Sequence, residues 1–232
     1  MEHIKEELTA QLENPTAFTI PIFGGIPVSQ SVLVSWILMV LLIVIMLLMT
    51  RNLKKERPGK VQLVLEYFVD FMNGFCENNI GRHGKDFAPW LGTVGLFIGF
   101  CNLSGLLGLV PPTKNLNVTL ALALTSVVLI YGASFRYNGL KGGLKKFIEP
   151  SPIMLPINIM EIGIRPLSLC MRLFGNVMAA FVVMELVKLL VPVGVPVVFS
   201  LYFDIFDGLI QTVVFVFLTA LFVGESLEEE EA

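Results

Sequence analysis

The feature that most constrains this sequence is a set of long apolar runs. The first extends from Val32 to Met49 and contains Trp36 and a single hydroxyl side chain, Ser35. A run of this length is what one helix needs to cross the hydrocarbon core of a bilayer. Of the 232 residues, 55% are hydrophobic and only 15% are charged, whereas a soluble domain usually carries about 25% charged residues. The chain is therefore predicted to be an integral membrane protein.

Further apolar runs follow, over residues 89–110, 116–135, 152–190 and 197–223. Pro111 to Asn115 forms a turn signal between the second and third runs, which predicts a transmembrane hairpin. Val61 to Phe75 instead alternates apolar residues with Glu66 and Asp70, a pattern typical of an amphipathic helix at the membrane interface. The predicted fold class is all-α, with five transmembrane helices and one interfacial helix.

Basic residues predict the orientation of the chain. Seven Lys or Arg lie between Arg51 and Lys85 and four between Arg136 and Lys146, whereas the turn at 111–115 holds only Lys114. By the positive-inside rule, both basic loops face the cytoplasm. We therefore expect a single membrane domain with an outward-facing N-terminal segment (1–30), a helical membrane region (31–224) and an acidic cytoplasmic tail (225–232).

The sequence shows no site for soluble-enzyme chemistry. It contains no nucleotide-binding loop, no HExxH pair and no GxSxG elbow, and we expect the polar, acidic stretch before residue 15 not to be a signal peptide. Cys76, Cys101 and Cys170 are far apart and lack the spacing of metal ligands. We expect buried or lipid-facing thiols, no bound metal or cofactor, and no nucleic-acid partner.

An arginine inside an apolar run needs a physical reason. Arg172 lies within the run 152–190, where insertion costs about 2.5–3.5 kcal/mol. At about 100° per residue, it belongs to one polar stripe of a helix, whose members are Glu161, Arg165, Ser168, Arg172 and Asn176. Gly175 and Ala179 are small enough to let a neighbouring helix come close.

Carboxylates recur in the following run. Ser200, Asp204, Asp207 and Gln211 are spaced to project from one helix face, and carboxylates in an apolar helix rarely face lipid. They indicate either an aqueous ion pathway or a structural network inside the bundle. Glu185 is likewise open to two interpretations, as part of such a pathway or as the structural partner of Lys188 one turn later.

Together these charged residues suggest a role in ion translocation. A partner carboxylate about 4 Å from Arg172 would be attracted by about 4 kcal/mol at an effective dielectric constant of about 20. That corresponds to about three pKa units, enough to expel a proton or a bound cation from the carboxylate. The sequence contains no obvious moving carboxylate, so we expect a second protein to supply it.

One ordered set of motifs resembles a known family. Arg172 to Asn176 (Arg-Leu-Phe-Gly-Asn), preceded by Arg-Pro-Leu-Ser-Leu at 165–169, is similar to the signature of subunit a of the F-type ATP synthases. Segments 102–107, 115–122 and 149–158 resemble further motifs of the same family, in the same order. The resemblance extends from about residue 30 to 224.

The resemblance implies a specific function. In that family, subunit a is a non-catalytic stator subunit that holds two long, tilted helices against a rotating ring of c subunits and works with peripheral-stalk b subunits and the rest of the complex. Two aqueous half-channels bring protons, or in some members sodium ions, to and from the ring. Arg172 matches the essential arginine of the family, and Asn176 and Gln211 match polar residues beside it. The expected location is an energy-coupling membrane, such as the bacterial plasma membrane, with the N-terminus outside and the C-terminus in the cytoplasm.

The sequence departs from the family pattern at two places. Many relatives carry an acidic residue or histidine nine positions after the arginine, where this chain has Phe181, and histidine or glutamate seven positions before the glutamine, where it has Asp204. We expect Asp204, Asp207 and Glu185 to line the outward-facing access path. The alternatives to the stator role are an independent secondary transporter, in which Arg172 would bind an anionic substrate, and a membrane scaffold. The sequence leaves the choice between proton and sodium open.

Overall fold

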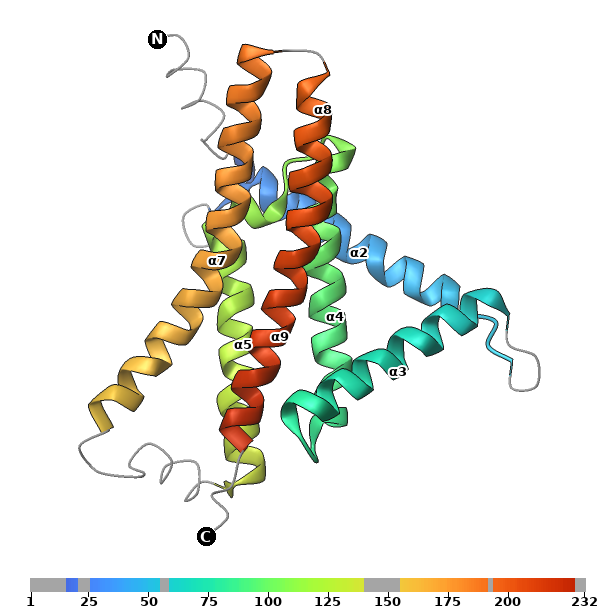
Figure 1. Ribbon diagram of the computed structural model, residues 1–232, viewed down its shortest axis with the longest axis vertical. Helices are drawn as coiled ribbons and strands as arrows, with labels where there is room; N and C mark the ends of the chain where they lie inside the picture. Colours follow the sequence, from blue (N-terminus) through green and yellow to red (C-terminus); the bar gives the residue numbers. More distant parts are fainter. Residues whose placement is uncertain (1–15, 21–25, 55–58, 140–154, 192–193, 228–232) are drawn as a thin grey trace. The chain divides into compact units, whose positions relative to one another are not determined.

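The computed structural model describes residues 16–20, 26–54, 59–139, 155–191 and 194–227 (Figure 1). The basic cluster 141–146, the motif segment 149–154 and the last five residues of the predicted tail lie outside this part of the chain. The described part is dominated by helices, most of which coincide with the apolar runs.

Five helical stretches are long and apolar enough to cross a membrane. They are α2 (Gln30–Thr50), α4 (Gly84–Leu103) with the short helix η1 (Ser104–Leu107), α5 (Leu116–Tyr137), α7 (Leu155–Leu190), and the succession of α8 (Val195–Ser200), η4 (Leu201–Asp207) and α9 (Gly208–Leu227). The predicted all-α membrane fold with five spans is confirmed.

Helix α3 (Lys60–Ile80) is the amphipathic element. It buries Met72, Cys76 and Ile80, while Tyr67 and Phe71 are exposed. An exposed aromatic and aliphatic surface on a helix that also carries charges suits the boundary between lipid and water. Its location at the membrane interface stays a prediction.

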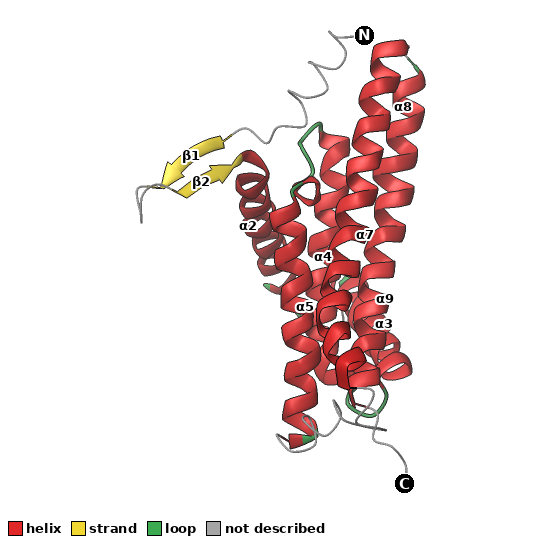
Figure 2. Ribbon diagram, turned by 90° about the vertical axis from the view of Figure 1, so that its left-hand side faces the viewer, coloured by secondary structure: helices red, strands yellow, loops and turns green. Residues whose placement is uncertain are grey.

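A small β-hairpin precedes α2 and was not predicted. Strand β1 (Thr16–Ile20) pairs antiparallel with β2 (Ile26–Ser29) (Figure 2). Thr, Phe and Ile favour extended backbone, but a strand this short gives little periodic signal beside the long apolar runs. The segment 1–30, predicted only as an outward-facing stretch, therefore contains ordered β structure.

The chain divides into two compact units. One contains the chain up to Val44, Phe97–Thr119 and Arg172–Thr212; the other contains Ile45–Leu96, Leu120–Met171 and the chain from Val213. The second unit has an apolar core in which Cys76, Leu91, Ile130, Ala220 and Val223 are fully buried. The first unit contains most of the predicted site residues.

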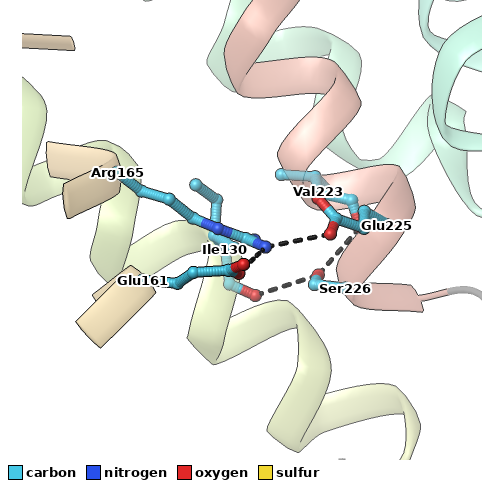
Figure 3. A network of polar contacts seen from close by, with 6 residues as sticks. All are labelled: Ile130, Glu161, Arg165, Val223, Glu225 and Ser226. Carbon is cyan, nitrogen blue, oxygen red and sulfur yellow. Dashed lines mark hydrogen bonds and ion pairs between the residues drawn. The ribbon is translucent and has the colours of Figure 1, made fainter. Parts of the chain in front are cut away.

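Arg165 is the centre of a polar network in the second unit (Figure 3). Its guanidinium lies 2.7 Å from Glu161 on the same helix and 3.0 Å from Glu225 of α9. Nearby, the Ser226 hydroxyl donates to the carbonyl of Ile130 in α5 at 3.2 Å. Helix α9 thus continues past the predicted boundary at 224, and Glu225 belongs to this network.

Candidate functional site

A pocket of about 760 Å³ lies within the first unit. Its walls come from the start of α2, the turn region 102–114 between α4 and α5, the C-terminal part of α7, and the stretch from α8 to the start of α9. Figures 1 and 2 show α8 running beside the C-terminal part of α7. Four of the predicted site residues line the pocket: Glu185, Asp204, Asp207 and Gln211.

The two aspartates lie on a π-helical segment, η4. Such segments widen the helix by one residue per turn and are frequent at functional sites. The Ser200 hydroxyl donates to Asp204 Oδ2 at 2.6 Å. A Cβ atom on Gly105 would come 2.6 Å from Asp204 Oδ1, so any other residue at 105 would force this carboxylate to move.

Asn102 fixes the other end of this segment. Its buried side chain donates from Nδ2 to the carbonyl of Gly208 at 3.0 Å and to Thr212 Oγ1 at 3.4 Å. Its Oδ1 accepts a hydrogen bond from Thr113 Oγ1 at 3.0 Å. This amide therefore joins α4, the turn before α5 and the start of α9 at the point where the π-helical segment ends.

Lys188 pairs with Glu185 on the α7 wall of the pocket, and a second lysine, Lys114, lines the same pocket. Lys188 Nζ lies 2.8 Å from Glu185 Oε1, so the pairing that helical spacing allowed is present, and Glu185 also lines the pocket. Lys114, from the turn η2 (Pro112–Lys114), is only 4% exposed, and its Nζ lies 3.4 Å from the centre of the Phe181 ring. Burial lowers the pKa of the Lys114 ammonium from its ordinary value, while the charge of Glu185 acts in the opposite direction.

Gln211 connects the pocket to the face of α7 that carries Arg172. Asn176 Nδ2 donates to Gln211 Oε1 at 2.7 Å, whereas the buried Gln211 Nε2 has no hydrogen-bond partner in the described part of the chain. Asn176 itself is exposed. Of these two amides, Gln211 lines the pocket, whereas Asn176 lies on the exposed surface of α7.

Arg172 differs sharply from Arg165. Its side chain is exposed, and it makes no ion pair with any residue that the structure describes. Ser168, one turn earlier on α7, is exposed as well. Neither residue lines the pocket, so the structure brings together Glu185, Asp204, Asp207 and Gln211, with Asn176 joined to them, and leaves Arg172 and Ser168 on the outer surface of α7.

Sequence reasoning did not identify Asn102, Gly105 and Lys114 as site residues. All three lie within or next to the motifs at 102–107 and 115–122, but their partners are about 70–110 residues away along the chain. Local spacing carries no information on such contacts. Only the polar character of Asn102 and Lys114 beside apolar runs could have drawn attention to them.

The described residues contain no group of three or more His, Cys, Asp or Glu side chains that could hold a metal ion. The cysteines are free and buried, and burial raises the pKa of the Cys76 thiol to about 11. At neutral pH this thiol is protonated and a poor nucleophile.

Comparison with known proteins identifies the family. The ATP synthase A chain family matches residues 32–224. A curated relative, ATP synthase subunit a of Moorella thermoacetica, is 36% identical over 202 residues, covering 87% of this chain and 92% of the relative. The chain therefore belongs to the ATP synthase A chain family.

Proposed function

We propose that this chain is the ion-translocating stator subunit of an F-type ATP synthase. It provides two half-channels to a ring of c subunits, and Arg172 couples the flow of protons or sodium ions to rotation of the ring and to ATP synthesis. Peripheral-stalk b subunits and the other subunits of the complex are its further partners. The chain conducts ions and leaves ATP chemistry to other subunits.

The observation that carries this proposal is the exposed Arg172. A cation on the outside of a membrane helix costs free energy unless a partner covers it. Because the described part of the chain supplies no carboxylate to Arg172, a neighbouring protein is the natural source. The small residues Gly175 and Ala179 on the same helix allow close approach of that neighbour.

The pocket supports an access path on one side of the ring. Its carboxylates are only partly buried, and hydroxyl and amide groups accompany them, which suits water and mobile protons. Gln211 Oε1 accepts a hydrogen bond from Asn176, and Gln211 Nε2 has no partner among the described residues, so this pair of amides joins the pocket to the helix that carries Arg172. We assign this pocket to the outward-facing half-channel.

Family membership and the exposed arginine favour the stator role over the alternatives. A secondary transporter that binds an anion at Arg172 would need an enclosed site around the guanidinium, but Arg172 is exposed and lies outside the pocket. A scaffold would not need an uncompensated charge in the membrane.

Docking of the ring can be tested by site-directed crosslinking in the assembled complex. Ala179→Cys, on the exposed surface of α7, is labelled with a photoactivatable maleimide and illuminated in membranes. We expect an adduct with the c subunit. Val40→Cys on α2, where the native residue is 60% exposed, is the control and should give none. The native cysteines are buried, so unmodified protein provides the background. Equal yields from both positions would contradict the proposed docking face.

The ion path can be tested by neutralising the pocket. The triple variant Glu185→Gln, Asp204→Asn and Asp207→Asn keeps the shape of each side chain and removes its charge. We expect ATP-driven ion uptake into inverted vesicles to fall by about a hundredfold or more, the range typical of losing a proton-transfer group. Glu77→Gln, at a residue that does not line the pocket, is the control. Wild-type uptake by the triple variant would exclude this route without touching the role of Arg172.

A further inference from the structure

Three cationic side chains lie at the junction where α2 ends and α3 begins (Figure 1). Arg51 and Lys54 follow the C-terminal end of α2, and Lys60 is the first residue of α3. All three are exposed, and none makes an ion pair with a residue that the structure describes. Because α2 is apolar up to Met49, these charges lie where the chain leaves the hydrocarbon core, at the level of the lipid headgroups.

The side chain of Gln62 fixes the backbone at this junction. The N–H of Lys54 donates to Gln62 Oε1 at 2.8 Å, and Gln62 Nε2 donates to the Lys54 carbonyl at 3.0 Å. The same nitrogen donates to Glu66 Oε1, one turn later on α3, at 2.8 Å, which orients the amide. One side chain therefore satisfies both backbone groups of Lys54 and holds this residue against the turn of α3 that begins with Lys60.

An exposed apolar stripe continues along α3 from this junction. Four large residues recur at the spacing of one helix face and are between 58% and 74% exposed: Leu63, Val64, Tyr67 and Phe71. Lys60 lies at the N-terminal end of the same face, whereas the residues that α3 buries, such as Cys76, lie on the other side of the helix. This surface therefore offers cations to an anionic headgroup and apolar contacts to acyl chains.

We propose that Arg51, Lys54 and Lys60 form a binding site for the headgroup of an anionic phospholipid, whose acyl chains lie along the apolar stripe of α3. Even when Glu66 is counted, three cations and one carboxylate leave two net positive charges at the junction. Basic residues directly after a transmembrane helix attract anionic lipids, and their N–H groups form charge-assisted hydrogen bonds to phosphate oxygens. The inference goes beyond the proposed function and depends on neither the pocket nor Arg172.

The test measures lipid enrichment beside the junction of the assembled complex in phosphatidylcholine nanodiscs. Asn52→Cys, at an exposed position, carries an uncharged donor fluorophore, and unmodified complex gives the background because the native cysteines of this chain are buried. Energy transfer is compared between trace amounts of phosphatidylglycerol and phosphatidylcholine that carry the same acceptor on an acyl chain. We expect a preference of about tenfold or more for phosphatidylglycerol, since each surface cation contributes about fivefold, and a decrease as salt rises.

Substitutions separate this site from general contact with the bilayer. Lys54→Gln should lower the preference about fivefold, the effect of one cation, whereas Lys54→Arg should retain it. Gln62→Leu keeps all three cations but removes both hydrogen bonds to Lys54, so it should lower the preference by a smaller factor. Arg82→Gln, at an exposed arginine beyond the C-terminal end of α3, is the matched control and should leave it unchanged. If Lys54→Gln does not assemble, Arg51→Gln replaces it.

Equal energy transfer to the two lipids in the wild type would overturn the proposal, and this is the result expected if an acidic segment of another subunit covered the cations. A full preference for phosphatidylglycerol in both Lys54→Gln and Gln62→Leu would overturn it as well. Neither result bears on Arg172, whose role is tested by ion uptake.

Discussion

Two arginines on α7, about two helical turns apart, have opposite surroundings. Arg165 is 15% exposed at its side chain and lies between two glutamates, with the Phe222 ring 5.0 Å away. Arg172 is exposed and has no acidic partner among the described residues. The first arginine is satisfied within the chain, so we expect it to stabilise the fold, whereas the second is available to another protein.

This difference predicts opposite outcomes for substitution. Arg165→Gln leaves two glutamates without their cation and should destabilise the protein by about 1–2 kcal/mol, between the values for exposed and buried pairs. That corresponds to a thermal midpoint lower by several degrees, while ATP-driven uptake by the assembled complex is retained. Arg82→Gln, at an exposed arginine, should leave both properties unchanged. Complete loss of uptake in a stable Arg165→Gln complex would contradict the assignment.

At the residue scale, the sequence predicted contacts only where the partners are close along the chain. The pair Glu185 and Lys188 follows from helical spacing. The link between Arg165 and Glu225 does not, because it joins two helices, and the acidic character of 225–231 favoured a solvated tail. The cation–π contact of Lys114 with Phe181 was unpredictable for the same reason.

At the scale of elements, the turn between α4 and α5 is part of the site and not a mere connection. Gly105 lets the Asp204 carboxylate approach the turn, and Asn102 holds the carbonyl of Gly208 where η4 ends. The turn thereby positions η4, the segment that carries Asp204 and Asp207. We expect changes in this turn to alter ion transport even though the turn carries no pocket carboxylate.

Gly105→Ala tests this positioning. The new methyl group would lie 2.6 Å from Asp204 Oδ1 and must displace that carboxylate, so we expect uptake to fall several-fold with assembly intact. Gly132→Ala on α5 is the control, because a Cβ there meets nothing within 4 Å and alanine favours helix. In an Asp204→Asn background the effect of Gly105→Ala should shrink, since neighbouring changes are not additive. Additive effects would show that Gly105 acts elsewhere.

The helices themselves were largely predictable, because a span in lipid must satisfy its backbone internally and be apolar over its length. Their bounds agree with the apolar runs except where polar residues extend a helix, as at Gly84–Ala88 before the run at 89. The β-hairpin and the π-helical segment were not predicted. A short hairpin has weak periodicity, and the contact at the end of the π-helical segment, between Asn102 and Gly208, joins residues that are far apart in the sequence.

As a whole molecule, the chain is a subunit of a multi-subunit ATP synthase. The family match covers most of its length. The exposed Arg172 lies on α7, and the pocket is lined by α7, α8 and η4, the helices expected to face the c ring. One charge crossing the membrane gains about 2.3 kcal/mol per 100 mV, and only a coupled partner can convert that free energy into rotation. In the proposed function, Arg172 is the charge that couples ion flow to the ring.

The most direct test is ATP-driven ion uptake into inverted membrane vesicles carrying Arg172→Ala, after assembly of the complex has been verified. Sodium and a protonophore, applied to the wild type, identify the coupling ion. We expect loss of uptake while ATP hydrolysis by the soluble subunits survives, because the ring carboxylate can no longer be discharged at the stator. Normal uptake by the assembled variant would contradict the proposed function, since Arg172 could not then be the coupling charge.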